Sequence, residues 1–240
     1  MLYLIGLGLN VDGISVYGLE VMKRCKRVYL ENYTVDFPYS IGELSQKLDK
    51  KILPADRDFV EGLSIVDEAK KMDVALLIYG SPLTATTHIA IIQEAKRMGI
   101  RVRVLSNASV LDAVAETGLQ LYKFGKVASM PKWQEDKNFT PDSFMEIVKE
   151  NQSINAHSLI LADIGLEFPE ALKQLEISAK KHEIKLTRLI VCQTLGTKHQ
   201  KIMYKSLEEL RGFTGVQKPY CIIIPGKMHF LEKEYLKNFE

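Results

Sequence analysis

The sequence predicts two α/β domains, with a mostly parallel sheet in the first domain and a mixed sheet in the second. Apolar runs of strand length alternate with helix-length segments along the chain, which is the pattern of strand–helix units. One of these runs, Val74–Tyr79, is apolar throughout, as is typical of a central parallel strand buried on both faces. The polar stretch 131–138 then interrupts the pattern and indicates a linker, so the expected domains are 1–131 and 139–240.

The composition is that of an ordinary globular protein. A chain of 240 residues with 46% hydrophobic and 26% charged residues is long enough for two such domains, each with a core. The 32 basic and 30 acidic residues give a net charge of +2, which says little about partners. The longest apolar runs, of about eight residues, are too short to cross a bilayer. The three cysteines lack C-x-x-C spacing and lie in apolar contexts, so we expect buried free thiols in a reducing cytoplasm.

The first half of the chain is predicted to contain four strand–helix units. The expected strands cover 2–9, 27–32, 74–79 and 100–105, and the expected helices cover 15–25, 41–48, 62–71, 86–98 and 109–116. Repeated units of this kind form a mostly parallel sheet through right-handed crossovers. We expect the segment 119–130 to close this first domain.

A mixed sheet is expected in the second half of the chain. A helix is expected over 141–150, because Pro141 suits a first helical turn and Thr140 can cap it. The remaining expected elements are a strand at 157–163, a helix at 169–181, strands at 185–193 and 202–204, a helix at 207–211, a strand at 220–224 and a terminal strand or helix at 229–239.

Three turns at strand ends are the candidate ligand-binding segments. Open α/β sheets bind ligands at the carboxyl ends of their strands, next to helix N-termini. The central turn, 80–88, breaks the apolar strand at Gly80 and Pro82, and Thr86 or Thr87 is expected to cap the next helix. The first turn, 6–13, and the third turn, 106–109, are also rich in small residues. Such turns offer backbone groups and hydroxyls, so they favour a partly apolar or cationic ligand, which we expect between the two domains.

Several residues have a functional and a structural interpretation. Glu31 ends the second strand where a dinucleotide fold places its ribose-binding acid, but Gly6, Gly8 and Gly13 do not have G-x-G-x-x-G spacing. His88 is either a general base or, as we favour, a capping or packing residue. The five histidines form no H-x-x-x-H or H-E-x-x-H pattern, so no metal site is expected. No nucleophile elbow or P-loop is present, and the basic tilt over 173–205 is interpreted as a solvated face.

Three stretches resemble the diphthine synthases, which are S-adenosylmethionine-dependent methyltransferases of diphthamide biosynthesis with the tetrapyrrole-methylase fold. These stretches are L-Y-L-I-G-L-G-L (2–9), G-S-P-L-T-A-T-T-H (80–88) and G-L-Q-L-Y-K-F-G (118–125). Further similarity lies at 107–110, 149–151, 157–164 and 224–229, so the resemblance spans nearly the full length. The A-T-T-H and G-L-Q-L-Y-K-F-G stretches are specific to this family rather than to the fold.

The resemblance implies methyl transfer from S-adenosylmethionine onto the modified histidine of translation elongation factor 2, with S-adenosyl-L-homocysteine as the product. It implies a cofactor folded in the cleft between the domains and held largely by backbone groups. The contacts it implies are Leu9, Ser81, Thr84, Ser109, Val110, Ala162, Leu195 and Tyr220. A cytoplasmic homodimer is also implied, with elongation factor 2 as its protein substrate and no membrane or direct nucleic-acid partner. A sulfonium methyl is already activated, so alignment can supply much of the rate, and no catalytic residue is assigned.

Two departures from the family pattern keep alternatives open. The usual G-D-P of the central turn is Gly80-Ser81-Pro82, and a segment like A-R-x-G is Gln193-Thr194-Leu195-Gly196. The lost carboxylate and arginine favour, as one alternative, a catalytically weak module that binds the cofactor or the translation factor. The other alternative is a methylase of a tetrapyrrole ring, against which the family-specific stretches and the absence of a His or Cys cluster argue.

Overall fold

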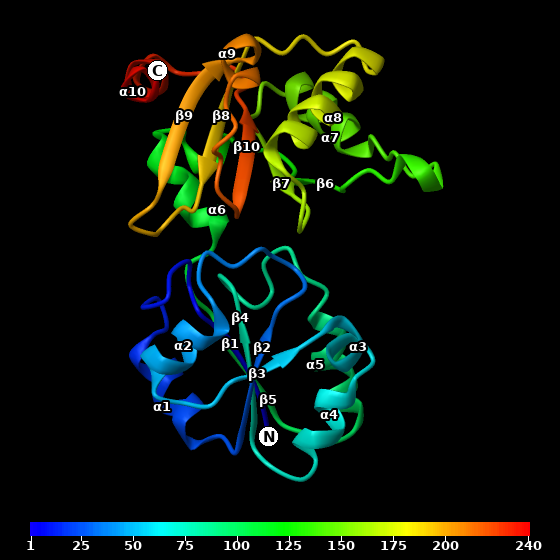
Figure 1. The fold of residues 1–240 in the computed structure, drawn as a ribbon, viewed down its shortest axis with the longest axis vertical. Helices are drawn as coiled ribbons and strands as arrows, with labels where there is room; N and C mark the ends of the chain where they lie inside the picture. The colour runs from blue at the N-terminus through cyan, green and yellow to red at the C-terminus, as the bar shows by residue number, and fades with distance from the viewer. The chain divides into compact units, whose positions relative to one another are not determined.

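The computed structural model describes residues 1–240 and contains two compact units, each with one sheet (Figure 1). The first unit is Met1–Ala113 and the second unit is Val114–Glu240. The sheet of the first unit is entirely parallel and that of the second is mixed, as predicted. None of the helices combines the length and apolar character that a bilayer-spanning helix requires.

The first unit has a five-stranded sheet whose strand order creates a switch point. Its strands are β1 (Leu2–Gly6), β2 (Arg27–Glu31), β3 (Leu53–Ala55), β4 (Val74–Ile78) and β5 (Val102–Leu105), in the order β3-β2-β4-β1-β5. The helices that follow the neighbouring strands β1 and β4 pack on opposite faces of the sheet. Ligands bind beside such a switch point, at the carboxyl ends of the strands. The first and central turns leave the sheet at this point.

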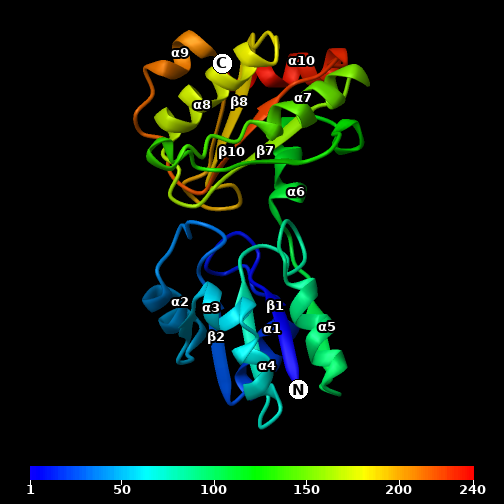
Figure 2. The ribbon, with the colours of Figure 1, turned by 90° about the vertical axis from the view of Figure 1, so that its right-hand side faces the viewer.

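Helices cover both faces of this sheet, as Figures 1 and 2 show. One face carries α1 (Val16–Arg24) and α2 (Ile41–Leu48), and the other carries α3 (Arg57–Glu61), α4 (Ser64–Ala69) and α5 (Ile89–Arg97). Side chains of β4 alternate between the two cores, with Leu76 packed on the side of α3–α5 and Leu77 on the side of α1 and α2. All five β4 residues are therefore buried, which confirms the predicted central strand.

Two features of the first unit differ from the prediction. The edge strand β3 and the helix α3 were not expected; β3 has only three residues, and its Pro54 is typical of an edge strand rather than a central one. Neither threonine caps α5, which begins at Ile89. Thr86 Oγ1 donates to Pro82 O at 2.8 Å, and Thr87 Oγ1 donates to Glu61 Oε1 at 3.2 Å. Both hydroxyls thus hold the central turn, and the helix begins only after it.

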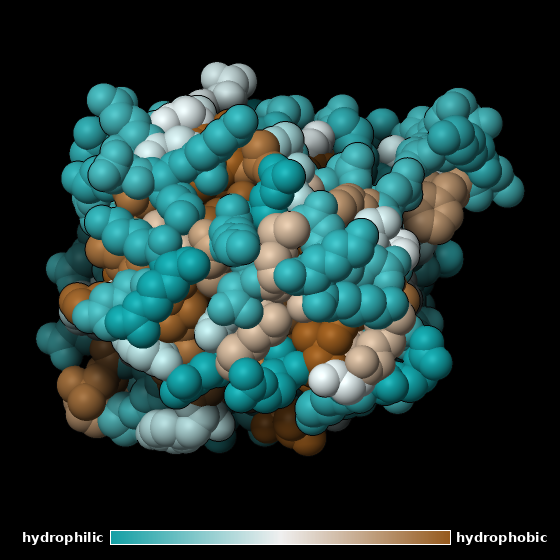
Figure 3. Space-filling model, turned by 90° about the horizontal axis from the view of Figure 1, so that it is seen from below, coloured by the Kyte–Doolittle hydropathy of each residue, from teal (hydrophilic) through white to brown (hydrophobic).

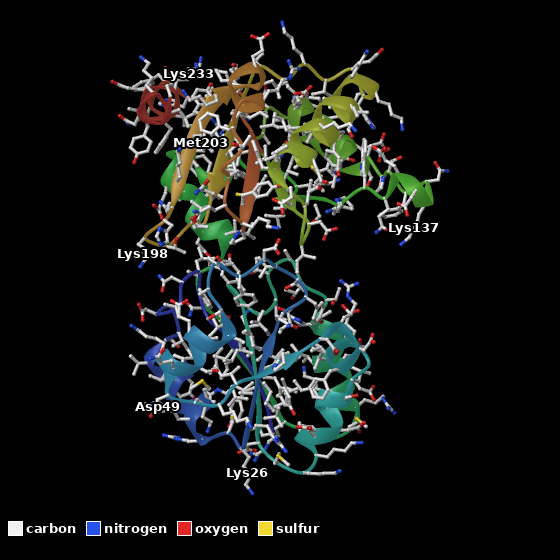
Figure 4. All side chains as sticks on the ribbon, in the orientation of Figure 1. Lys26, Asp49, Lys137, Lys198, Met203 and Lys233 are labelled. Carbon is white, nitrogen blue, oxygen red and sulfur yellow. The ribbon has the colours of Figure 1, made fainter.

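The second unit has a mixed sheet with helices over one core. Its strands are β6 (Ala128–Met130), β7 (Ser158–Ala162), β8 (Arg188–Gln193), β9 (Lys201–Ser206) and β10 (Tyr220–Ile224), in the order β6-β7-β10-β8-β9. Only β6 and β7 are parallel. Helices α7 (Ser143–Ser153), α8 (Phe168–Lys181) and α9 (Leu207–Arg211) supply apolar side chains to the core, with Phe144 and Phe168 the largest. Lys198 lies on the connection between β8 and β9, and Met203 lies on β9 (Figure 4).

The division between the units comes earlier than the predicted boundary at 131. The segment 119–130, expected to close the first domain, belongs to the second unit because β6 pairs with β7. Backbone bonds from Gly125 N–H to His157 O and from His157 N–H to Lys123 O extend this pairing. The expected linker 131–138 is part of the connection from β6 to α7 within the second unit, and Lys137 lies at the outer tip of this connection (Figure 4). The prediction missed β6 because a strand of three residues is too short to show its periodicity in the sequence.

Smaller corrections concern the ends of the second unit's helices. α7 begins at Ser143 rather than at Pro141, and Asp142 rather than Thr140 precedes it. The terminal segment is helical, with α10 (Phe230–Leu236) followed by a 3₁₀ turn, η4 (Lys237–Phe239).

All three cysteines are buried free thiols, as predicted. The face drawn in Figure 3 is mostly polar, with apolar side chains in small separate groups, as is normal for a folded surface.

Candidate functional site

The first and central turns are joined by backbone hydrogen bonds beyond the ends of β1 and β4. Leu7 N–H donates to Ile78 O at 2.9 Å. Gly8 and Gly80 then exchange two hydrogen bonds, of 3.1 Å from the Gly8 N–H and 2.9 Å from the Gly80 N–H. These two glycines have φ of +69° and +68°, a conformation that L side chains rarely adopt. The two glycines therefore allow both turns to leave the sheet together.

Asn107 ties the third turn to the first. Its Nδ2 donates to Gly6 O at 3.0 Å and to Gly13 O at 2.8 Å. Its Oδ1 accepts the Ala108 N–H at 2.8 Å. The side chain thus satisfies carbonyls of the first turn that no strand partner reaches. The three candidate turns form one hydrogen-bonded platform at the carboxyl ends of β1, β4 and β5.

Leu9, Ser81 and Thr84 lie on this platform. Leu9 is buried, and its carbonyl accepts the Tyr79 hydroxyl at 3.1 Å. Thr84 N–H donates to Ser81 O at 3.1 Å, which closes the central turn. The N–H groups of Leu9 and Ser81 and the hydroxyls of Ser81 and Thr84 have no hydrogen-bond partner within the first unit. Next to them Ala85 has φ of +54°, a strained value for a non-glycine residue, of the kind that clusters at binding sites.

Ser109 and Val110 begin the short helix α6 (Val110–Ala113) after the third turn. The Asp112 carboxylate accepts both the Ser109 N–H at 2.7 Å and the Ser109 hydroxyl at 3.0 Å. The Ser109 Oγ in turn accepts the Leu111 N–H at 3.2 Å. The Ser109 side chain is thus engaged by its own helix, and its Cα lies 3.5 Å from where a Cβ on Gly80 would be. Ser109 therefore packs against the central turn.

The three candidate residues of the second unit lie at one end of its own sheet. Cys221 of β10 pairs with Leu161 of β7, so Tyr220 and Ala162 are adjacent at the end of these strands. Tyr220 also pairs with Gln193 of β8, and Leu195 follows that strand directly. Tyr220 is held by a hydrogen bond from its hydroxyl to Leu166 O at 3.0 Å. The structure thus gathers Ala162, Leu195 and Tyr220 within the second unit.

The segment Gln193–Gly196, which lacks the arginine of the family's A-R-x-G pattern, is held by hydrogen bonds within the second unit. Gln193 is buried, and its Oε1 accepts the Gln217 N–H at 3.2 Å. The following Thr194 has φ of +45°, and its N–H donates to Pro219 O at 2.8 Å. The loop after β8 is therefore held by amide groups rather than by a charged side chain.

His88 and Glu31 do not have the exposure that catalysis or ribose binding would need. Both side chains are buried, at 1% and 0% exposure. The His88 Nδ1–H donates to Pro82 O at 2.9 Å, so the imidazole supports the central turn from inside. The packing role that the sequence favoured for His88 is confirmed. Because Glu31 cannot reach a ligand at the surface, its interpretation as a ribose-binding acid is wrong.

A second buried network explains the family-specific stretch 118–125. Glu232 of α10 accepts hydrogen bonds from the Gln120 N–H at 2.9 Å and the His229 N–H at 2.6 Å, and it also pairs with Lys123. His157 Nδ1 accepts the Gly226 N–H, so its Nε2–H donates to Glu232 Oε1 at 3.1 Å. Sequence reasoning missed this network. Its one local signal was the His229-x-x-Glu232 spacing of a capping box, which α10 indeed has.

The arrangement suits a ligand that is bound by hydrogen bonds and close packing. The first unit offers unpartnered N–H and hydroxyl groups on Leu9, Ser81 and Thr84, but the platform presents no arginine or lysine clamp for a polyphosphate. The glycine pair Gly8–Gly80 allows a ligand to approach the backbone closely. These groups suit a ligand that carries hydrogen-bond acceptors.

Comparisons with known proteins agree on one family. Residues 1–211 match a family model described as Tetrapyrrole (Corrin/Porphyrin) Methylases. The chain is 36% identical over 269 residues to a diphthine methyl ester synthase of Saccharomyces cerevisiae, covering 100% of this chain and 89% of that protein. It is 35% identical over 253 residues to a diphthine synthase of Methanocaldococcus jannaschii, covering 99% of this chain and 98% of that protein.

A solved structure agrees with these relatives. A crystal structure of diphthine synthase superposes with a TM-score of 0.89 at 32% sequence identity, covering 99% of this chain and 95% of that chain. Fold and sequence thus agree over nearly the whole length. The chain belongs to the tetrapyrrole methylase family, within it to the diphthine synthases, and is a methyltransferase.

Proposed function

We propose that this methyltransferase transfers a methyl group from S-adenosylmethionine to the modified histidine of translation elongation factor 2, releasing S-adenosyl-L-homocysteine. The observation that supports this most is the bonded platform of three turns, because it presents free N–H and hydroxyl groups at the switch point of the sheet. The proposed cofactor contacts in the first unit are Leu9, Ser81, Thr84, Ser109 and Val110. Those in the second unit are Ala162, Leu195 and Tyr220.

The proposed acceptor is a carboxylate, because the yeast relative is named a diphthine methyl ester synthase. S-adenosylmethionine would supply a methyl group that its sulfonium already activates. A carboxylate is ionised near neutral pH and needs no general base. This agrees with the burial of His88, which leaves no histidine of the central turn free to take a proton. The platform residues would then act by orienting the two reactants and excluding water.

Calorimetric titration with S-adenosyl-L-homocysteine tests the cofactor. Micromolar binding, worth about −8 kcal/mol, is expected. Transfer of labelled methyl groups to elongation factor 2 that carries the unmethylated intermediate tests the reaction. Binding without transfer would instead support the cofactor-binding module, an alternative that the segments Gly80–Pro82 and Gln193–Gly196 favour because they lack an acid and an arginine of the family pattern. Absence of binding by folded protein would contradict the proposal.

Ser81→Ala is expected to weaken S-adenosyl-L-homocysteine binding by roughly 2- to 10-fold, since one uncharged hydrogen bond contributes about 0.5–1.5 kcal/mol. The Ser81 hydroxyl has no partner within the unit, so its loss leaves the fold intact. Ser64→Ala is the matched control, because it makes the same chemical change at an exposed residue at the start of α4. Equal affinities of wild type and Ser81→Ala, measured by the same titration, would remove Ser81 from the proposed contacts.

The remaining proposals concern partners and place of action. If elongation factor 2 is the substrate, the methyltransferase acts in the cytoplasm, where translation takes place, and we further propose that it works as a homodimer. Sedimentation analysis of the purified chain tests the dimer. A single species at the mass of one chain, 27.2 kDa, would contradict it.

A further inference from the structure

Glu31 and His88 form a buried pair that the proposed reaction does not use. Glu31 ends β2 and His88 ends the central turn, and the His88 Nε2 lies 4.0 Å from Glu31 Oε1. Both oxygens of Glu31 and the Nε2 of His88 are buried without a hydrogen bond of ordinary geometry. Buried polar atoms without partners are rare in native proteins, so each calls for a physical explanation.

The hydrogen bond on the other side of the imidazole decides how the pair can interact. His88 Nδ1 must carry a proton, because it faces the carbonyl of Pro82 at 2.9 Å. In a neutral imidazole the Nε2 is then an acceptor. An ionised Glu31 would place a second acceptor opposite it, and the two atoms would repel. One added proton, on either atom, makes the two atoms complementary, and a hydrogen bond then requires them to approach from the 4.0 Å that separates them.

The surroundings favour retention of that proton. Burial raises the pKa of Glu31 to about 7, and the charge of Glu61 on α3 also raises it. Hydrogen bonding with the Thr34 side chain, which favours the ionised form, and the charge of Arg57 lower it. The Tyr33 hydroxyl is also buried near Glu31, and burial raises the pKa of that phenol as well. Burial lowers the pKa of His88, while its bond to Pro82 and the charge of Glu61 raise it. A neutral carboxylic acid that donates to a neutral imidazole satisfies both partners without a buried charge.

We infer that Glu31 and His88 share one proton and thereby act as positioning residues for the central turn. The shared proton fixes the imidazole, and the imidazole fixes Pro82, which lies between the proposed cofactor contacts Ser81 and Thr84. This inference rests on the proposed function for the identity of the ligand. Neither residue touches the cofactor, since both are buried in the first unit.

Loss of the proton is expected to loosen the central turn. Above a pH of about 7 the pair exists increasingly as two facing acceptors, so the cofactor site should lose affinity. The effect on stability has the same sign. Because the pKa of Glu31 is raised on folding, its contribution to stability is complete below its ordinary pKa of 4.5 and is lost as the pH rises to about 7.

Glu31→Gln tests the inference, because a glutamine of the same shape carries permanent N–H groups that can donate to the His88 Nε2. S-adenosyl-L-homocysteine is titrated calorimetrically at pH 6.5 and 8.5 into wild type, Glu31→Gln and the control Glu20→Gln, whose side chain is exposed on α1. Wild type and Glu20→Gln are expected to bind at least fivefold more weakly at pH 8.5 than Glu31→Gln does. Any change in the protonation of the ligand between the two pH values affects all three proteins equally.

The same pH dependence in all three proteins would overturn the inference. Failure of all three to bind at either pH would refute the proposed cofactor instead. Urea denaturation at pH 5 and pH 8 then tests whether Glu31 and His88 share a proton. Loss of stability at the higher pH in wild type but not in Glu31→Gln supports the shared proton. Parallel behaviour of the two proteins contradicts it.

Discussion

Glu232→Ala is expected to lower the free energy of unfolding of the second unit by about 3–5 kcal/mol, because it removes one member of a buried ionic network. The carboxylate is 1% exposed and bonds to the backbone of Gln120 and His229 as well as to Lys123 and His157. Without it, the N–H groups of Gln120 and His229 and the His157 Nε2–H would lose an acceptor, and the Lys123 ammonium would keep only its bond to Lys227 O. No neighbouring side chain can replace it.

Urea denaturation followed by tryptophan fluorescence measures this change. Trp133 is the only tryptophan and lies in the second unit, so its emission reports on that unit alone. Glu234→Ala, on the exposed side of the same helix, is the matched control and should change the unfolding free energy by less than about 0.5 kcal/mol. A loss below about 1 kcal/mol for Glu232→Ala would show that the network contributes little.

The same residue gives the second unit a defined acid sensitivity. Burial alone would raise the pKa of Glu232, but hydrogen bonds from Gln120, Lys123, His229 and His157 lower it to about 2. A carboxyl whose pKa falls on folding stabilises the fold above its ordinary pKa of 4.5, and this stabilisation is lost as the pH falls to about 2. In Glu232→Ala, the free energy of unfolding of the second unit should therefore depend less on pH in this range.

Gly6→Ala is expected to disrupt the platform and weaken S-adenosyl-L-homocysteine binding by at least tenfold, with a loss of about 1–3 kcal/mol of stability through overpacking. A Cβ at this position would lie 2.6 Å from Gly80 O and 2.9 Å from Asn107 Cβ. Because Gly80 belongs to the central turn and Asn107 to the third, relief of the clash separates all three turns. Calorimetric titration and the protection of β1 and β4 amides from hydrogen exchange measure the two effects.

Gly42→Ala provides a control of the same chemical change in the same unit. Gly42 lies inside α2, and the nearest atom to an added Cβ is Ser40 Oγ at 3.8 Å. Alanine should therefore stabilise the first unit by roughly 0.5–1 kcal/mol and leave ligand binding unchanged. Equal effects of the two substitutions would contradict the argument from the close approach at Gly6.

The longer elements could be predicted from the sequence because their signals are local. Val74–Tyr79 is recognisable as a central strand by its unbroken apolar character, and helix α2 (Ile41–Leu48) has the predicted bounds. The missed strands, β3 and β6, have three residues each and lie at the edges of their sheets. Such strands owe their conformation to pairing with a neighbour rather than to a pattern of their own, and the error at β6 moved the predicted domain boundary.

The candidate site was predictable only in part, for a related reason. The turns that carry Leu9 and Ser81 follow from glycine spacing and from the rule that ligands bind at strand ends. The Glu31–His88 pair and the contact of His157 with Glu232 join residues 57 and 75 positions apart in the chain. A single sequence contains no periodic signal for such pairs. Each glutamate and histidine therefore had a plausible surface role until the fold showed its burial.

The place of Glu232 in the last helix also bears on how the chain matures during synthesis. All five strands of the first unit lie within the first 113 residues, so this unit can fold while translation continues. In the second unit, Lys123 and His157 must wait for a carboxylate that is synthesised 109 and 75 residues after them. The second unit therefore completes its buried network only after α10 has emerged from the ribosome, and deletion of α10 would leave Lys123 and His157 without this partner.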